Sequence, residues 1–338
     1  MAAEILPTHT RELFEEAVRR ASELLRAGEV VALPTETVYG LAANALDEKA
    51  VAKIFEIKGR PANNPIIVHV AGDEMAKSCV AEFPAAAEKL SKSFWPGPLT
   101  LVLPRSKKIP NLVTADGDTV GVRWPSHPFM QAVIRECGFP LAAPSANLSN
   151  QISPTNAAHV RAQLGEKIPL IVDGGQSQVG IESTVLDLTV TPARILRPGM
   201  IHAESLAAAV GGEVQSSKSK IQSRDSALRS PGLLQKHYSP KAKLLVLDWN
   251  DDADLHARLA ARRSPLATSF IIAHTKIPGG FAPENVSVIP HDAEAFARAL
   301  YAELHRCDAA GAKLIVVEAP PDSPEWSGIA DRLKRAAA

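Results

Sequence analysis

The sequence predicts an α/β protein with an open mixed twisted sheet, followed by a small Rossmann-like parallel α/β domain. In the N-terminal part, several strand-like segments follow one another without a helix between them, which favours a mixed sheet over a doubly wound one. In the C-terminal part, strand-like and helix-like segments alternate. Residues 211–241 lose apolar periodicity and are rich in serine, lysine and glycine. We therefore expect a domain at 1–210, a linker at 211–241 and a second domain at 242–338.

The N-terminal domain begins with an amphipathic helix that Gly28 closes. Its apolar face is formed by Phe14, Ala17, Val18, Ala21, Leu24 and Leu25. Runs of β-branched and apolar residues predict strands at 29–33, 65–70, 99–104, 119–124, 140–144, 169–173, 183–189 and 193–197. Helical periodicity predicts further helices at 47–57, 73–94, 127–137, 155–164 and 202–210.

The C-terminal domain shows the alternation typical of a parallel sheet. Its expected strands are 243–249, 269–274, 285–290 and 313–320, and its expected helices are 251–263, 292–307 and a last one from Glu325. No GxGxxG motif follows its first strand, so the Rossmann-like pattern alone indicates no nucleotide. We expect a binding or regulatory accessory domain.

Composition excludes several classes of protein. Lysine plus arginine equals aspartate plus glutamate, 37 each in 338 residues, so no overall field draws the chain to nucleic acid or a membrane. The three cysteines are far apart and odd in number, which argues for a reducing compartment and against a disulfide framework or structural zinc. The N-terminus lacks the apolar core of a secretory signal, and no segment reaches the roughly 18 apolar residues of a membrane span. We expect a soluble cytoplasmic protein.

The segment PTETVYG, residues 34–40, follows the apolar run 30–33 and places small polar residues where a strand ends at a proline. Such a turn suits a backbone that approaches a ligand. The alternative is an ordinary strand-to-helix turn in which Thr35 or Thr37 caps the next helix.

Lys58 and Arg60 form a candidate phosphate clamp. A helix ends at Gly59, and Pro61 disfavours α geometry at Arg60, so residues 58–60 are expected to be extended. Side chains two apart in an extended chain project to one side. Two neighbouring cations favour an anion between them. The alternative is a solvated helix end whose cations complement the helix dipole.

His69 and Arg123 lie on predicted strands. His69 shares a strand face with Ile67, and it is either a core histidine or a ligand group. Arg123 lies on the face opposite Val122 in a predicted central strand, where a buried guanidinium needs an anion. A bound carboxylate and an internal salt bridge would serve equally well.

A third candidate site is PLAAPSANLSNQISPTN, residues 140–156. Ser145 and Asn147 alternate onto one side, and Ser153 or Thr155 can cap the helix that follows, which suits a phosphate. No GxSxG motif surrounds Ser145, so it is not expected to be a nucleophile.

Ser183 and Arg197 stand at the ends of later predicted strands. The interval from Gly175 to Gly180 matches that of a Walker loop, but residues 181–182 are Ile-Glu where Lys-Ser/Thr is required, which excludes a P-loop.

The motifs PTETVYGLA, KGRP-x3-P-x3-H, FWPGPLTLVL, GVRWP, APSANLS, DGG, STV and RPG occur in this order from residue 34 to 199. Together they resemble the YrdC-like family, in the long form of the L-threonylcarbamoyladenylate synthases. The resemblance covers residues 8–210 and continues to HYSP at 237–240, which looks like that family's HYxP signature. It extends more loosely to the C-terminal domain.

The resemblance implies an enzyme that uses ATP, bicarbonate and L-threonine to make threonylcarbamoyl-AMP and pyrophosphate for a tRNA modification. It implies ATP contacts at Lys58, Arg60, Ser145, Asn147, Ser153, Arg197 and Tyr238. It implies a threonine pocket of Thr35, His69, Arg123 and Ser183. Magnesium would be bound through the ATP phosphates, with no metal ligand from the protein. Partner proteins would transfer the product to tRNA, and direct tRNA binding by this chain is expected to be weak or absent.

The implied chemistry agrees with these residue types. A carbamate attacks the α-phosphorus of ATP, so positioning and charge stabilisation are sufficient and no protein nucleophile is needed. We expect electrostatic roles for Lys58 and Arg60, with Tyr238 of the linker closing over the nucleotide as a lid. The sequence assigns no role to Glu36. The alternative function is a double-stranded RNA or tRNA binding module; a hydrogenase-maturation carbamoyl-transfer domain would need zinc-finger and acylphosphatase-like segments that this chain lacks.

Overall fold

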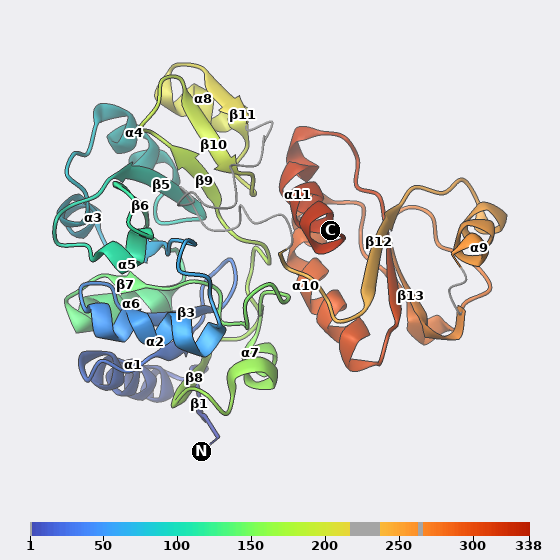
Figure 1. The fold of residues 1–338 in the computed structure, drawn as a ribbon, viewed down its shortest axis with the longest axis horizontal. Coiled ribbons are helices and arrows are strands. Elements are labelled where there is room, and N and C mark those ends of the chain that lie inside the picture. Colours follow the sequence, from blue (N-terminus) through green and yellow to red (C-terminus); the bar gives the residue numbers. More distant parts are fainter. Residues whose placement is uncertain (1, 217–236, 263–265) are drawn as a thin grey trace. The chain divides into compact units, whose positions relative to one another are not determined.

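The computed structural model describes residues 2–216, 237–262 and 266–338 (Figure 1). The chain divides into two compact units. The first comprises Met1–Ser149 and Ser153–Leu233, and the second comprises Asn150–Ile152 and Leu234–Ala338. Most of the expected linker, residues 217–236, lies outside the described residues. No helix in the described part of the chain is long and apolar enough to cross a membrane.

The first unit is built on an 11-stranded sheet, which is mixed as the sequence predicts. In spatial order its strands are β1 (Glu4–Pro7), β8 (Leu170–Asp173), β2 (Val31–Leu33), β3 (Gly40–Asn44), β7 (Leu141–Ala142), β4 (Val68–His69), β6 (Thr119–Arg123), β5 (Leu99–Pro104), β9 (Thr184–Asp187), β10 (Ala193–Arg197) and β11 (Val214–Ser216). Three of these strands, β1, β3 and β11, were not predicted. The pairs β1/β8, β8/β2, β4/β6, β5/β9 and β10/β11 are parallel, and the other neighbours are antiparallel.

The helices of this unit follow the predicted pattern with three differences. They are α1 (Arg11–Arg26), α2 (Glu48–Lys58), α3 (Asp73–Cys79), α4 (Ala85–Phe94), α5 (Asn111–Thr114), α6 (Pro128–Cys137), α7 (Ala157–Leu164) and α8 (Ala203–Val210). The short helix α5 was not predicted at all. The prediction of a single helix at 73–94 is wrong, because two helices form. Pro84 has extended backbone geometry and precedes the first residue of the second helix. The expected cap of α7 by Ser153 or Thr155 is also wrong, since Asn156 Oδ1 accepts from His159 N at 2.9 Å.

Two apolar cores lie on the two faces of the sheet, and β2 shows how the sequence builds both. Ala32 packs with one core, whereas Val31 and Leu33 pack with the other, because side chains alternate across a strand. The second core is completed by α1 and α6, which Figure 1 shows in the lower part of the first unit. The helices α1 and α6 therefore pack against one face of the sheet.

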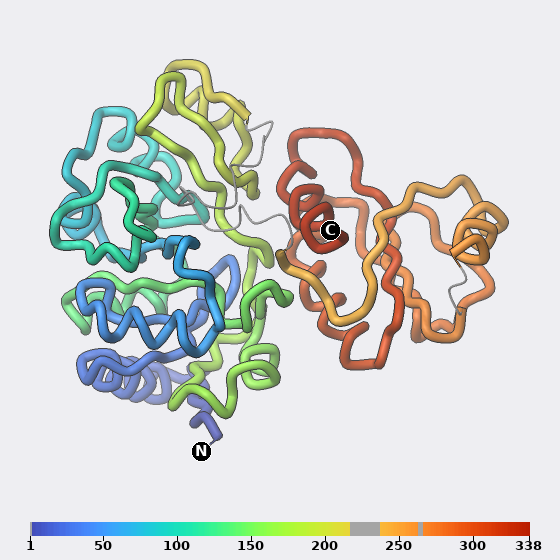
Figure 2. The backbone as a smooth tube through the Cα atoms, viewed as in Figure 1, coloured from blue at the N-terminus to red at the C-terminus, as the bar shows by residue number. Residues whose placement is uncertain are grey.

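The second unit contains a four-stranded, all-parallel sheet in the order β12 (Lys243–Leu247), β15 (Leu314–Glu318), β13 (Ser269–Ala273) and β14 (Val286–Val288). Its helices are α9 (Asp252–Ala261), α10 (Ala293–Ala309) and α11 (Ser327–Ala336), with short 3-10 turns at Leu266–Thr268, Pro283–Asn285 and Pro324–Trp326. Figure 2 shows the backbone of this unit in orange and red. The predicted parallel α/β architecture is confirmed.

Candidate functional site

The PTETVYG segment is a buried turn between two antiparallel strands, β2 and β3. The Oγ1 atom of Thr35 donates to Val38 O at 2.6 Å and lies 2.9 Å from Thr37 Oγ1. The hydroxyl of Tyr39 donates to Gly175 O at 2.7 Å. The alternative in which Thr35 or Thr37 caps a helix is therefore wrong, because a strand follows the turn.

Arg123 lies at the end of β6 and faces the PTETVYG turn. Its Nη2 atom lies 2.7 Å from Glu36 Oε1, and its Nη1 donates to Thr37 Oγ1 at 2.9 Å. Its Nε donates to Gly97 O at 3.2 Å. Glu36 Oε1 also accepts from Ser126 N at 3.0 Å. Of the two alternatives left open for Arg123, the structure shows the internal salt bridge, and the partner is the glutamate to which the sequence assigned no role.

His69 lies beside Arg123, since the parallel register of β4 and β6 pairs their Cα atoms. Ile66, Val68 and Val70 pack in the apolar core, which confirms the predicted opposite face for His69. Burial and the charge of Arg123 lower the pKa of His69 to about 3 against the opposing effect of Glu36, so its imidazole is neutral. Burial alone would raise the pKa of Glu36, but Arg123 and Ser126 N lower it below its ordinary value. Glu36 is therefore an ionised carboxylate.

Three buried polar atoms in this cluster lack a hydrogen-bond partner among the residues that the structure describes. They are Glu36 Oε2, His69 Nδ1 and Arg123 Nη2, the last of which has only its ion-pair contact. Each of the three side chains belongs to a residue that is at most 5% exposed. Buried polar groups in folded proteins are almost always satisfied. A concentration of unsatisfied atoms on three neighbouring residues is typical of a site that binds a polar ligand.

The candidate clamp differs from its predicted geometry. Lys58 is the last residue of α2 and Gly59 is left-handed, with φ 60°, so the expectation that residues 58–60 are extended is wrong. The Nζ atom of Lys58 donates to Ser145 O and Asn147 O, both at 2.5 Å. The guanidinium of Arg60 donates to Asn64 Oδ1 at 2.8 Å. Burial and the charge of Arg60 lower the pKa of Lys58 well below its ordinary value. The effect of Arg60 shows that the two side chains interact electrostatically.

Lys58 connects α2 to the segment that carries Ser145 and Asn147. That segment in turn contacts the PTETVYG turn. Gly40 forms a β-bridge with Ser145, and Ala146 N donates to Tyr39 O at 2.7 Å. The segment with Ser145 and Asn147 therefore lies directly beside the PTETVYG turn.

Ser183 and Arg197 are also brought together. The guanidinium of Arg197 donates from Nε to Ser183 O and from Nη2 to Ser183 Oγ, both at 3.1 Å. Ser183 Oγ lies 2.8 Å from Thr100 Oγ1. The hydroxyl of Ser153 donates to Glu182 Oε1 at 2.6 Å. Ser183, expected in the threonine pocket, thus contacts Arg197, expected at the nucleotide.

Tyr238 belongs to the second unit. Its ring centroid lies 5.9 Å from that of Tyr301, and the Arg332 guanidinium lies 5.3 Å from its centre. Its predicted role as a lid over the nucleotide is not tested by these contacts and stays a prediction.

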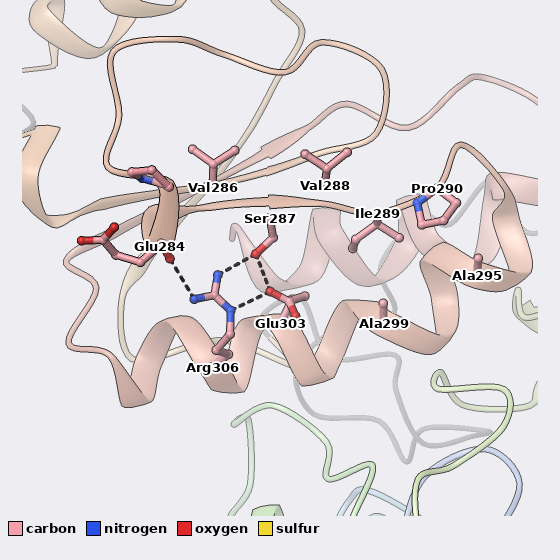
Figure 3. A pocket seen from close by; sticks show the side chains of 11 residues that line it. Glu284, Val286, Ser287, Val288, Ile289, Pro290, Ala295, Ala299, Glu303 and Arg306 are labelled. Carbon is pink, nitrogen blue, oxygen red and sulfur yellow. Dashed lines mark hydrogen bonds and ion pairs between the residues drawn. The ribbon is translucent and has the colours of Figure 1, made fainter.

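A cavity of about 500 Å³ in the second unit lies along β14 and α10 (Figure 3). Its polar side chains bind one another: Arg306 donates to Glu303 Oε2 at 2.8 Å and to Ser287 Oγ at 2.6 Å, and Ser287 Oγ also contacts Glu303. The guanidinium further donates to Glu284 O at 3.0 Å. These mutual bonds contrast with the unsatisfied atoms around Arg123.

Comparison with known proteins gives the same assignment for both units. A family profile described as "Telomere recombination" (Sua5_yciO_yrdC) matches residues 23–199, and one described as "Threonylcarbamoyl-AMP synthase, C-terminal domain" matches residues 201–338. The threonylcarbamoyl-AMP synthase of Pyrococcus abyssi is 39% identical over 97% of this chain and 96% of its own. The chain belongs to the threonylcarbamoyl-AMP synthase family. The same enzyme of Bacillus subtilis is 39% identical over 95% of this chain and 92% of its own.

The fold is also that of a solved threonylcarbamoyl-AMP synthase. A crystal structure of P. abyssi Sua5 complexed with L-threonine superimposes with a TM-score of 0.90 at 38% identity, covering 99% of this chain and 98% of that one. The resemblance noted from the ordered motifs is therefore confirmed, and the RNA-binding alternative is not needed to explain the chain.

Proposed function

We propose that the buried cluster around Arg123 is the amino-acid site at which this threonylcarbamoyl-AMP synthase uses L-threonine, bicarbonate and ATP to form threonylcarbamoyl-AMP and pyrophosphate. The observation that carries the proposal is the set of unsatisfied atoms on Glu36, His69 and Arg123. A free amino acid supplies a carboxylate, an amino group and, in threonine, a hydroxyl, which can satisfy donors and acceptors of this kind. The L-threonine complex of the P. abyssi relative supports this choice of ligand.

In this proposal the threonine pocket comprises Thr35, His69, Arg123 and Ser183. Arg123 receives the carboxylate: its guanidinium has five N–H groups, and three of them face Glu36, Thr37 and Gly97. His69 contributes a neutral imidazole rather than a positive charge, because its pKa is about 3.

In this proposal the ATP site comprises Lys58, Arg60, Ser145, Asn147, Ser153 and Arg197. Tyr238 belongs to the second unit, and its expected ATP contact stays a prediction. Two contacts support this proposal: Arg197 donates to Ser183 O, and Lys58 donates to Ser145 O. Magnesium belongs to the ATP phosphates in this proposal. No group of three or more His, Cys, Asp or Glu residues in the described part of the chain could hold a metal ion.

The reaction needs positioning more than covalent chemistry. The carbamate of threonine attacks the α-phosphorus of ATP in line with departing pyrophosphate, and the cations neutralise the phosphate charge. Downstream transfer proteins would then carry the threonylcarbamoyl group to tRNA. Zero net charge gives this chain no general attraction for the tRNA itself.

The test is pyrophosphate release from ATP and bicarbonate, with and without L-threonine, for the wild type, Lys58→Ala and Arg123→Ala. We expect threonine-dependent release by the wild type and loss of at least 100-fold in each folded variant, because charged groups at such a site contribute roughly 3 kcal/mol. Threonine-dependent release that survives Arg123→Ala would contradict the assigned amino-acid site. Release that survives Lys58→Ala alone would contradict only the nucleotide site.

A further inference from the structure

The role of Glu36 is the most specific question that the structure raises. Within the described part of the chain its carboxylate is used on one side only. Oε1 contacts Arg123 Nη2 at 2.7 Å and Ser126 N at 3.0 Å, whereas Oε2 is buried and has no hydrogen-bond partner there. A glutamate whose task was only to hold Arg123 would gain by satisfying both oxygens within the protein. The free oxygen indicates a second task.

The surroundings of Oε2 define what it can bind. Glu36, Arg123 and His69 interact electrostatically, so any group that reaches Oε2 also lies within the field of the other two. An ionised carboxylate accepts hydrogen bonds and donates none. The missing partner is therefore a donor, and in an amino-acid site whose carboxylate end is taken by Arg123, the donor is the α-amino nitrogen.

We propose that Glu36 is the residue that recognises the substrate nitrogen: Oε1 orients Arg123 for the carboxylate, and Oε2 accepts an N–H from the amino group. This inference rests on the proposed function and deepens it. The same contact is available before and after carbamate formation, because both the amine and the carbamate nitrogen carry an N–H. The contact between Oε2 and the nitrogen favours amino acids over acids of the same shape that lack the amino group.

A ligand comparison tests the proposal directly. Removing the amino group of L-threonine gives (R)-3-hydroxybutyrate, which keeps the carboxylate, the hydroxyl and the methyl group. Equilibrium binding of both compounds is measured by calorimetry or ligand-observed NMR for the wild type, Glu36→Gln and Glu36→Asp. We expect the wild type to prefer threonine and the preference to fall about tenfold or more in Glu36→Gln, since a hydrogen bond to a charged group is lost. Glu36→Asp should fall between them.

Thr37→Val provides the matched control. This near-isosteric change removes the acceptor of Arg123 Nη1 but leaves Glu36 unchanged. It should weaken both ligands by the same factor and preserve their affinity ratio. Thermal unfolding and ATP binding of each variant establish that the fold is retained.

Two results separate the hypotheses. If Glu36→Gln and Glu36→Asp weaken threonine and (R)-3-hydroxybutyrate equally, as Thr37→Val does, Glu36 acts only through Arg123 and the proposal is overturned. If the folded wild type binds neither compound, the assigned amino-acid site itself fails, whatever the variants do.

Discussion

Glu36 Oε1 and Arg123 Nη2 form a buried ion pair at 2.7 Å, with side chains only 7% and 4% exposed. Removing one partner of such a pair leaves an uncompensated buried charge, whereas replacing both by apolar or neutral groups is often nearly neutral. Single and double variants of this pair can therefore change the free energy of unfolding and the activity separately.

Arg123→Met should lower the free energy of unfolding by about 3–5 kcal/mol, and the double variant Glu36→Gln/Arg123→Met should recover most of this loss. Neither variant should be active, because the anion-binding group is absent from both. Urea unfolding and pyrophosphate release give the two readouts. Arg258→Met, which breaks the exposed pair with Asp254, should cost at most about 1 kcal/mol. A double variant as unstable as Arg123→Met would show that the pair matters by packing rather than by charge.

The pH dependence of stability should change sign when Arg123 is removed. In the wild type the pKa of Glu36 is lowered in the folded state, so its contribution is present above the unfolded pKa of about 4.3 and is lost as pH falls through the folded pKa. In Arg123→Met, burial acts without its opposing charge and raises that pKa. Stability should then be highest in acid and fall as pH rises. Urea midpoints of both proteins between pH 3 and 8 measure the difference, because the wild-type loss lies below pH ~4.3. Parallel profiles would contradict it.

The three thiols should be inert in the folded protein. Cys79, Cys137 and Cys307 are free and buried, and burial raises the pKa of Cys79 to about 11 and that of Cys307 to about 12. The pKa of Cys137 is also raised, with burial as the main cause. Because the thiolate is the reactive form, Ellman's reagent at pH 8 should titrate no thiol natively and all three after denaturation. Fast reaction of one thiol in the native protein would indicate local opening around that residue.

Gly199 sits where no side chain fits. A Cβ atom there would lie 2.6 Å from Thr184 N and 3.0 Å from Glu182 O, both backbone atoms. Gly199→Ala should therefore displace the segment that follows Arg197, lower the thermal midpoint and weaken ATP binding. Gly212→Ala is the matched control, because its Cβ would meet nothing within 4 Å. Equal effects of the two substitutions on midpoint and ATP affinity would show that the close approach is not limiting.

The alternation rule predicted side-chain faces well and contacts between distant segments poorly. It placed His69 and Arg123 on the faces that the structure shows, because both lie in strands with a continuous apolar opposite face. It could not pair Glu36 with Arg123, since nothing local connects a turn to a strand far along the chain. The strand β3 was missed because GLAAN contains no β-branched residue.

The prediction that residues 58–60 are extended is wrong for a local reason. Proline 61 restricts Arg60, but the left-handed Gly59 had already turned the chain, and that conformation is open to glycine without cost. The charge of Arg60 acts on Lys58, but the two head groups bind different segments, Ser145 O for Lys58 and Asn64 O for Arg60. The phosphate clamp itself stays a prediction.

ATP binding should take up a proton through Lys58. Burial and the charge of Arg60 lower the pKa of Lys58 well below its ordinary value, so this amine loses its proton more readily than an exposed lysine does. A phosphate nearby favours the charged form and raises the pKa again. Calorimetric titration of ATP in two buffers of different ionisation enthalpy, between pH 7 and 9, should show net proton uptake that grows with pH. In Lys58→Met this uptake should disappear while the titration of ATP itself remains. Uptake that is absent in the wild type, or unchanged in Lys58→Met, would place the phosphates away from this amine and return Lys58 to a purely structural link between α2 and the Ser145 segment.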